Sequence, residues 1–245
     1  MLKVDLNCDM GESFGVWKMG RDAELMKYIT SANIACGFHA GDPGVMRKTI
    51  EIALANNVYI GAHPGFPDLQ GFGRRNMNLS ADEVFDIVLY QVSAIKGMCE
   101  SLGGKLHHVK PHGALYNQAA KDKNLAQAIA EAVESLDKNL ILYGLSGSLL
   151  ISEAENVGVK TKNEVFADRT YQSDGSLTPR SEPNALIIDE TAAIEQILQM
   201  IADQTVTATN GEKVLIKADT ICIHGDGENA LEFAKKINTE LRRIS

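Results

Sequence analysis

Histidines recur where runs of apolar residues end, at positions that we expect to be the ends of strands. Five of the six histidines lie in or just after such a run: His39, His63, His107, His112 and His224. A histidine can act as a general acid or base or bind a metal, although a single histidine more often has a structural hydrogen-bonding role. This recurrence predicts one shared polar site in which about one or two of the histidines are structural.

Carboxylates end the first of these runs. In DLNCDMGE, the side chains of Asp5, Asn7 and Asp9 lie on one side of an extended strand, with Glu12 just beyond it. Asp9 and Glu12 can therefore share a pocket, where a carboxylate could act as a general base, bind a divalent cation or orient a histidine. The alternative is that these carboxylates only meet solvent at the end of the strand. If the strand belongs to a parallel barrel, a functional role for them is favoured.

Two further motifs carry candidate catalytic side chains. In CGFHAGDP, Asp42 before Pro43 is typical of a helix N-cap, so His39 is the stronger functional candidate. In VKPHGALYN, Lys110 and His112 lie on the same side of the fourth expected strand. A buried lysine there could stabilise an oxyanion, and burial would lower its pKa toward the range of a general acid; a structural ion pair is the alternative.

Arginines in two loops could hold an anion. The segment GAHPGFPDLQGFGRR is rich in glycine and proline and ends in Arg74 and Arg75, either of which could clamp a carboxylate or phosphate, or be solvated. Residues 166–183 lack apolar periodicity and predict a long loop. That loop contains Asp168, Arg169 and Arg180.

Strand and helix patterns alternate along the chain, which predicts an α/β fold with a parallel sheet. We expect strands over 3–9, 32–36, 59–62, 107–110, 140–144, 164–167 and 220–224, and helices over 44–57, 80–102, 123–136, 147–157, 191–204 and 228–243. Ser80 and Glu83 form a capping-box pattern, and residues 205–213 suggest a hairpin. Ligand sites lie beyond the carboxyl ends of the strands in an open sheet and in a barrel alike.

Composition limits the classes of function. The 245 residues, 44% of them hydrophobic, fit a single domain over residues 1–245. The net charge of -8 argues against nucleic-acid and membrane partners, and we expect a cytoplasmic protein because no long apolar run or leader pattern is visible. Four cysteines without CxxC spacing are expected to be reduced thiols, and Cys8, Cys36 and Cys222, within apolar strand-like runs, are expected to be buried. No P-loop or GxGxxG motif occurs.

The sequence closely resembles the LamB/YcsF family, to which the A subunits of 5-oxoprolinases belong. The motifs that carry the resemblance are DLNCDMGESFG (5–15), SANIACGFHAGDP (31–43), GAHPGFPDLQGFGRR (61–75), VKPHGALYN (109–117) and EVFADRTYQSDGSLTPR (164–180). It extends to HGD at 224–226 and departs at Ser13, where many relatives have glycine. The resemblance implies a seven-stranded parallel βα barrel of the glycoside hydrolase and deacetylase type.

The resemblance also implies an activity that depends on partners. Similar proteins work with 5-oxoprolinase subunits B and C (PxpB and PxpC) to open 5-oxo-L-proline to L-glutamate, with hydrolysis of ATP to ADP and phosphate. Because this chain has no P-loop, we expect ATP to be handled with the partner subunits and the activated lactam to be opened in this barrel.

Chemistry then suggests roles for individual residues. We expect Asp9, Glu12 or His39 to activate water, and Lys110 with His112 to stabilise the oxyanion. The expected substrate-binding residues are His63, Arg74, Asp168, Arg169, Arg180 and His224, with Arg169 or Arg180 on the substrate carboxylate.

Two other functions stay open. One is a metal-dependent carbohydrate N-deacetylase, in which Asp9, His39 and His63 bind a divalent ion that activates water. The other is a protein that binds a small molecule without catalysis. The sequence leaves open whether a divalent metal is present.

Overall fold

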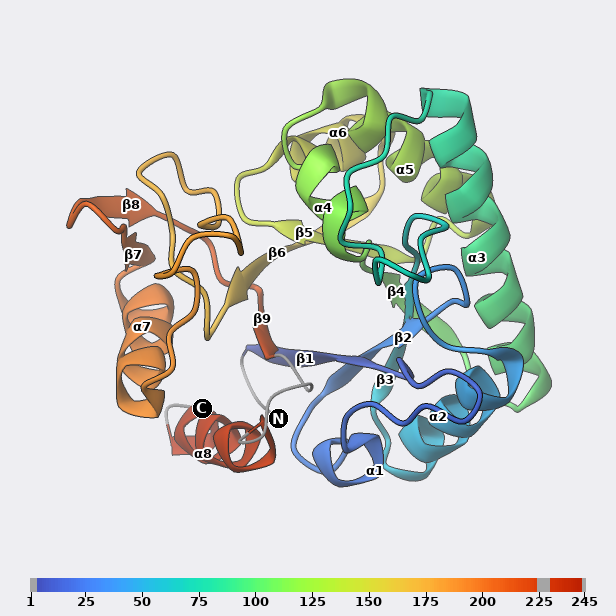
Figure 1. Ribbon diagram of the computed structural model, residues 1–245, viewed down its shortest axis with the longest axis horizontal. Helices are drawn as coiled ribbons and strands as arrows, with labels where there is room; N and C mark the ends of the chain where they lie inside the picture. The colour runs from blue at the N-terminus through green and yellow to red at the C-terminus, as the bar shows by residue number, and fades with distance from the viewer. Residues whose placement is uncertain (1–3, 224–229, 244–245) are drawn as a thin grey trace.

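Parallel strands close into a barrel in the computed structural model, which describes residues 4–223 and 230–243. Within these ranges the barrel has seven strands, in the order β1 (Asp5–Met10), β2 (Ser31–Ala35), β3 (Tyr59–His63), β4 (Leu106–Val109), β5 (Ile141–Leu145), β6 (Lys160–Phe166) and β9 (Thr220–Ile223). Strand β9 pairs with both β6 and β1 and so closes the ring (Figure 1). The prediction of a seven-stranded parallel barrel is confirmed.

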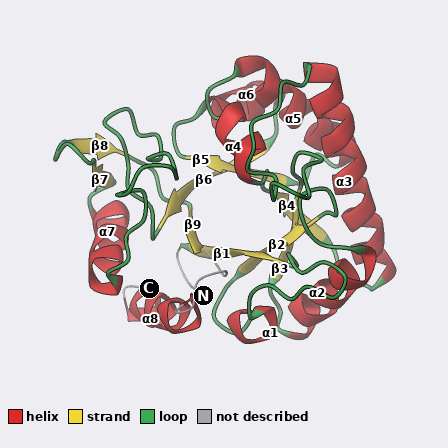
Figure 2. Cartoon of the chain, in the orientation of Figure 1, coloured by secondary structure: helices red, strands yellow, loops and turns green. Residues whose placement is uncertain are grey.

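Helices surround the barrel on its outside (Figure 2). They are α1 (Asp22–Leu25), α2 (Pro43–Ala55), α3 (Ala81–Ser101), α4 (Gly113–Ala119), α5 (Lys123–Leu136), α6 (Leu149–Val157), α7 (Glu190–Ala202) and α8 (Ala230–Arg243). The expected hairpin is confirmed as the antiparallel pair of β7 (Thr205–Thr207) and β8 (Lys213–Leu215), beside α7 at the left of Figure 1. Among the described residues, no helix combines the length and the apolar character needed to cross a membrane.

One strand boundary differs clearly from its prediction. The sixth strand was expected over 164–167, but β6 begins at Lys160, which pairs with Ile141 of β5. Lys160, Thr161 and Lys162 are exposed or half-buried, so the backbone joins the sheet where the side chains meet solvent. A search for apolar runs cannot find the polar end of such a strand.

Helix caps hold the loops that follow the strands. Asp42 caps α2 as predicted, since its Oδ1 accepts hydrogen bonds from the backbone N–H of Gly44 and Val45. Its Oδ2 also accepts from the Gly15 N–H at 2.8 Å, which ties the loop after β1 to α2.

The capping box of Ser80 and Glu83 at the start of α3 is also confirmed. The loop after β3 is anchored to α3 by Gln91, whose amide exchanges two 2.9 Å hydrogen bonds with the Gly65 backbone.

The barrel interior is polar. Asp5 and Asn7 point inward as the strand period predicts, and Asn7 Nδ2 donates to Glu164 Oε1 at 2.9 Å and to Thr220 Oγ1 at 2.8 Å. His108 stacks on Tyr143 with ring centroids 4.2 Å apart. These contacts between side chains of different strands fix the positions of the strands relative to one another. The four cysteines are free, as expected, and Cys8, Cys36 and Cys222 are buried as predicted; Cys99 is buried as well.

We predict that Gly61→Ala destabilises the fold. A Cβ at this position of β3 would overlap the ring of His108 inside the barrel, and overpacking of this kind costs about 1–3 kcal/mol. Gly97→Ala, on the exposed face of α3 with nothing within 4 Å of the added methyl, serves as the control and should be neutral or stabilising. Urea unfolding of both variants measures the difference, and equal stabilities would contradict the expected overlap.

Candidate active site

A cavity of about 750 Å³ opens at the carboxyl ends of the barrel strands. Asp9 reaches it from β1, His63 from the last position of β3, and Lys110 and His112 from the segment that follows β4. Glu12, in the loop after β1, also lines it. The fold therefore brings together side chains that lie about a hundred residues apart in the sequence, because parallel strands end at the same rim.

Lys110 lies at the centre of a buried ion-pair network. Its Nζ is 3.0 Å from Asp9 Oδ1 and 2.9 Å from Glu164 Oε1, and the Lys110 side chain is only 3% exposed. It also donates to Asn7 Oδ1 at 3.2 Å and to Cys222 Sγ at 3.0 Å. Burial alone would lower the pKa of Lys110, but Asp9, Cys222 and Glu164 together outweigh it and hold that pKa well above its usual value. The expectation of a lowered lysine pKa is wrong, and the alternative of an ion pair is confirmed.

Backbone carbonyls fix the tautomers of two histidines. His63 Nδ1 is 2.7 Å from the Lys110 carbonyl oxygen, and His112 Nε2 is 2.8 Å from the Phe72 carbonyl oxygen. A carbonyl can only accept, so both of these ring nitrogens carry their proton. The other two nitrogens, His63 Nε2 and His112 Nδ1, are 2.9 Å apart. Burial, followed by the charge of His63, lowers the pKa of His112 to about 3, so its neutral form dominates near pH 7.

His39 is enclosed by glycines and by another imidazole. A Cβ at Gly65 would lie 2.6 Å from His39 Nδ1, and a Cβ at Gly73 would lie 2.7 Å from His39 Cβ. The His39 ring stacks on that of His112 with centroids 3.7 Å apart. Burial lowers the pKa of His39 well below its usual value. The glycines of the loop after β3 therefore leave the space that this histidine fills, and His39 itself stands behind the cavity wall.

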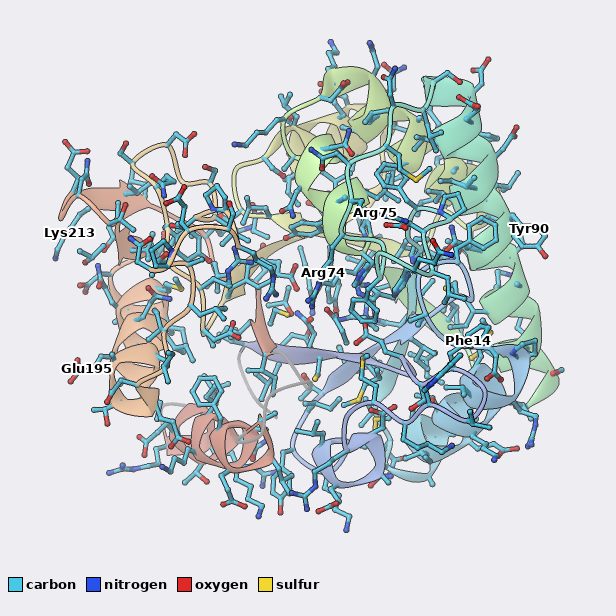
Figure 3. All side chains as sticks on the ribbon, in the orientation of Figure 1. Phe14, Arg74, Arg75, Tyr90, Glu195 and Lys213 are labelled. Carbon is cyan, nitrogen blue, oxygen red and sulfur yellow. The ribbon has the colours of Figure 1, made fainter. Side chains whose placement is uncertain are left out.

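The two neighbouring arginines after β3 have different surroundings. Arg74 lines the cavity, and its guanidinium carbon lies 4.9 Å from the centre of the Phe72 ring. Arg75 instead forms an ion pair with Asp68 and keeps 64% of its side chain exposed. Figure 3 labels both arginines and shows Arg74 over the middle of the barrel. Of the pair, only Arg74 is placed to meet a ligand in the cavity.

The loop after β6 contributes two more arginines to the cavity wall, Arg169 and Arg180. Arg169 is buried, and its Nε donates to the Ala185 carbonyl at 3.1 Å. Burial, followed by the charge of Arg180, lowers the pKa of Arg169 to about 10. Two like charges at one wall of a cavity are stabilised by a bound anion. This wall therefore suits a carboxylate or a phosphate.

The remaining predicted site residues lie elsewhere. Asp168 precedes Arg169 but does not line the cavity, and its carbonyl accepts from the Ile187 N–H at 2.8 Å. His224 lies outside the described residues. Sequence reasoning missed Glu164 and Cys222, both of which contact Lys110. The position of Glu164 within a buried strand was the available signal, since a buried carboxylate needs a partner.

Residues 4–245 match the sequence model of the LamB/YcsF family. The chain belongs to the LamB/YcsF family. A relative from Tolumonas auensis, named as the A subunit of 5-oxoprolinase, is 61% identical over 241 residues, which cover 98% of this chain and 96% of the relative. A Bacillus subtilis protein of the same name is 56% identical over 242 residues, covering 99% and 94% of the two chains.

A solved structure shares the LamB/YcsF barrel. The crystal structure of the lactam utilization protein from Thermus thermophilus matches with a TM-score of 0.93 at 45% identity. The match covers 99% of this chain and 97% of that protein. The closed parallel barrel is therefore common to both proteins.

We predict that Lys110→Met destabilises this LamB/YcsF barrel by about 3–5 kcal/mol, because it leaves the buried carboxylate of Glu164 and the half-buried carboxylate of Asp9 without their cation. The double variant Lys110→Met/Glu164→Gln removes one of these charges and should recover part of the loss. Urea unfolding at pH 7 compares the two variants with the unsubstituted chain. A single variant as stable as the parent would show that the ion pair does not hold the barrel interior.

Proposed function

We propose that this chain is the A subunit of an ATP-dependent 5-oxoprolinase and works with subunits B and C (PxpB and PxpC). The reaction opens 5-oxo-L-proline to L-glutamate and hydrolyses ATP to ADP and phosphate. The names of the relatives support this proposal. The observation that carries it is the pairing, in one cavity, of an arginine-lined wall with a cluster of carboxylates and imidazoles at the strand ends.

The cavity suits a small anionic substrate. 5-Oxoproline has a carboxylate at one end and a cyclic amide at the other. Arg74, Arg169 and Arg180 line the cavity and offer guanidinium groups to the carboxylate, while Asp9 and His63 line it at the strand ends, where the amide would lie. The volume of about 750 Å³ exceeds what the free lactam needs and leaves room for a phosphorylated form of it.

ATP is needed because a lactam is a poor electrophile. We place phosphoryl transfer from ATP to the amide oxygen on the partner subunits, since this chain has no P-loop motif. Water then adds to the ring carbonyl carbon of the phosphorylated lactam. The ring carbon–nitrogen bond breaks as the nitrogen takes up a proton, which leaves γ-glutamyl phosphate. A second water releases phosphate and glutamate.

Asp9 is the residue best placed to accept the proton of the attacking water. Its Oδ1 receives hydrogen bonds from Lys110 Nζ at 3.0 Å and Asn33 Nδ2 at 2.8 Å, which fix the carboxylate at the cavity. Asp9 Oδ2 is 3.3 Å from His63 Nε2. In this arrangement Lys110 positions Asp9 rather than meeting the oxyanion itself. The Nε2 proton of His112 is already donated to Phe72, which leaves it unavailable to an oxyanion.

The whole proposal is tested by reconstitution. The purified chain is mixed with or without subunits B and C, given 5-oxoproline and ATP, and assayed for glutamate and phosphate together. We expect stoichiometric formation of both products only in the complete mixture, because activation and ring opening lie on different subunits. Complete mixtures that form no glutamate would overturn the proposal.

The role of Asp9 is tested by Asp9→Asn in the reconstituted enzyme. We expect kcat to fall by about 10²–10⁴-fold, the usual contribution of a general base, with a smaller change in KM. Asp86→Asn, on the exposed face of α3, is the matched control and should leave both constants unchanged. A kcat within a few-fold of the parent value in Asp9→Asn would remove Asp9 from the proton transfer.

A further inference from the structure

Three imidazoles and one carboxylate converge at the cavity wall. Glu12, His39, His63 and His112 each offer one ligand atom, and these four atoms lie within 4.8 Å of one another. The three histidines are buried, and the side chain of Glu12 is 12% exposed. The four residues come from the ends of β1, β2, β3 and β4 or from the segments that follow them, so only closure of the sheet brings them together.

Two of the imidazoles direct their second ring nitrogens at each other. The carbonyls of Lys110 and Phe72 take the protons of His63 Nδ1 and His112 Nε2, so the rings face one another through His63 Nε2 and His112 Nδ1, 2.9 Å apart. Facing lone pairs at this distance repel unless a cation or a proton lies with them. In a metal-bound histidine, one ring nitrogen binds the ion and the other usually donates its N–H to an acceptor such as a backbone carbonyl.

The surroundings of His39 favour a bound metal ion over a proton shared between His63 and His112. It is fully buried, and neither of its ring nitrogens has a hydrogen-bond partner among the described residues. Its Nε2 lies 3.7 Å from Glu12 Oε1, the same distance that separates Glu12 Oε1 from His112 Nδ1. A proton between His63 and His112 would satisfy those two rings and leave His39 unexplained. A metal ion can take all three imidazoles.

We infer that Glu12, His39, His63 and His112 form a binding site for a divalent first-row transition metal ion, with zinc as the best fit. Imidazole nitrogens with one carboxylate are typical zinc ligands. Calcium and magnesium prefer oxygen ligands, so this donor set disfavours them. The set differs from the one expected for the deacetylase alternative, because Glu12 and His112 take the place of Asp9 beside His39 and His63.

The site has to rearrange when it binds the ion. Bonds of about 2.1 Å in a tetrahedral site place ligand atoms about 3.4 Å apart. Here the four atoms spread over 4.8 Å, so most must move inward, whereas His63 Nε2 and His112 Nδ1, 2.9 Å apart, must separate slightly. The ring planes of His39 and His112 are inclined by only 3° to each other. The His39 ring must therefore turn to direct Nε2 at a shared ion. Gly65 and Gly73 have no side chains to obstruct this turn. Three of the ligands, Glu12, His63 and His112, line the cavity, so the ion would be reached from it.

Metal titration of the chain alone tests the inference. The purified protein is stripped with a chelator and titrated with cobalt(II), whose visible absorption reports tetrahedral binding, and with zinc in competition with a chromogenic chelator. His63→Gln and His112→Gln remove one ligand each. His107→Gln is the matched control, because His107 stacks on Tyr59 away from the four ligands.

We expect one ion per chain in the parent and in His107→Gln, and zinc affinity at least about 100-fold weaker in His63→Gln and His112→Gln. Zinc should also raise the Tm of the parent chain, a readout that does not depend on the variants folding. A parent chain that binds no ion, or variants that bind as tightly as the parent, would overturn the inference. Because partners and 5-oxoproline are absent, this result stands apart from the reconstitution assay.

Discussion

The buried ammonium of Lys110 is the constraint on which the rest of the site depends. A charge inside a barrel is tolerated only when it is paired, and Lys110 pairs with Asp9 and Glu164. These partners belong to β1 and β6, so the pairing also ties together separate strands of the barrel. The Lys110 carbonyl in turn orients His63. The position of Asp9 and the tautomer of His63 therefore both depend on Lys110, through its side chain and its backbone.

Charge is arranged in two zones around the cavity. At the strand ends, the carboxylates of Asp9 and Glu12 line the cavity, whereas the loops above supply Arg74, Arg169 and Arg180. An anion entering such a cavity is stabilised at the arginine-lined wall and repelled near the carboxylates. A molecule with one anionic end and one neutral polar end therefore has a preferred orientation, with its neutral end toward the strands. That orientation comes from charge placement alone and precedes any chemistry.

The periodicity of side chains along single strands and helices explains which features could be predicted from the sequence. The alternation of strands and helices predicted the barrel, and the strand period placed Asp5, Asn7 and Asp9 on its inner side. Distances across the barrel could not be predicted from the sequence, because they depend on the stagger between strands and not on the spacing of residues along a single strand. The pKa of Lys110 was therefore misjudged: burial was visible in the sequence, but the approach of Glu164 was not. The same limit hid the meeting of Glu12 with His112.

His39 shows how a departure from ordinary packing marks a functional position. Buried polar atoms are nearly always hydrogen-bonded, because an unpaired one loses its water without compensation. Among the described residues, His39 has no such bond, although Gly65 and Gly73 are shaped around its ring. An apolar side chain of similar size would fill this space with less loss of stability. An imidazole at this position therefore lowers the stability of the fold. That loss is explained only if the ring nitrogens take part in the neighbouring site.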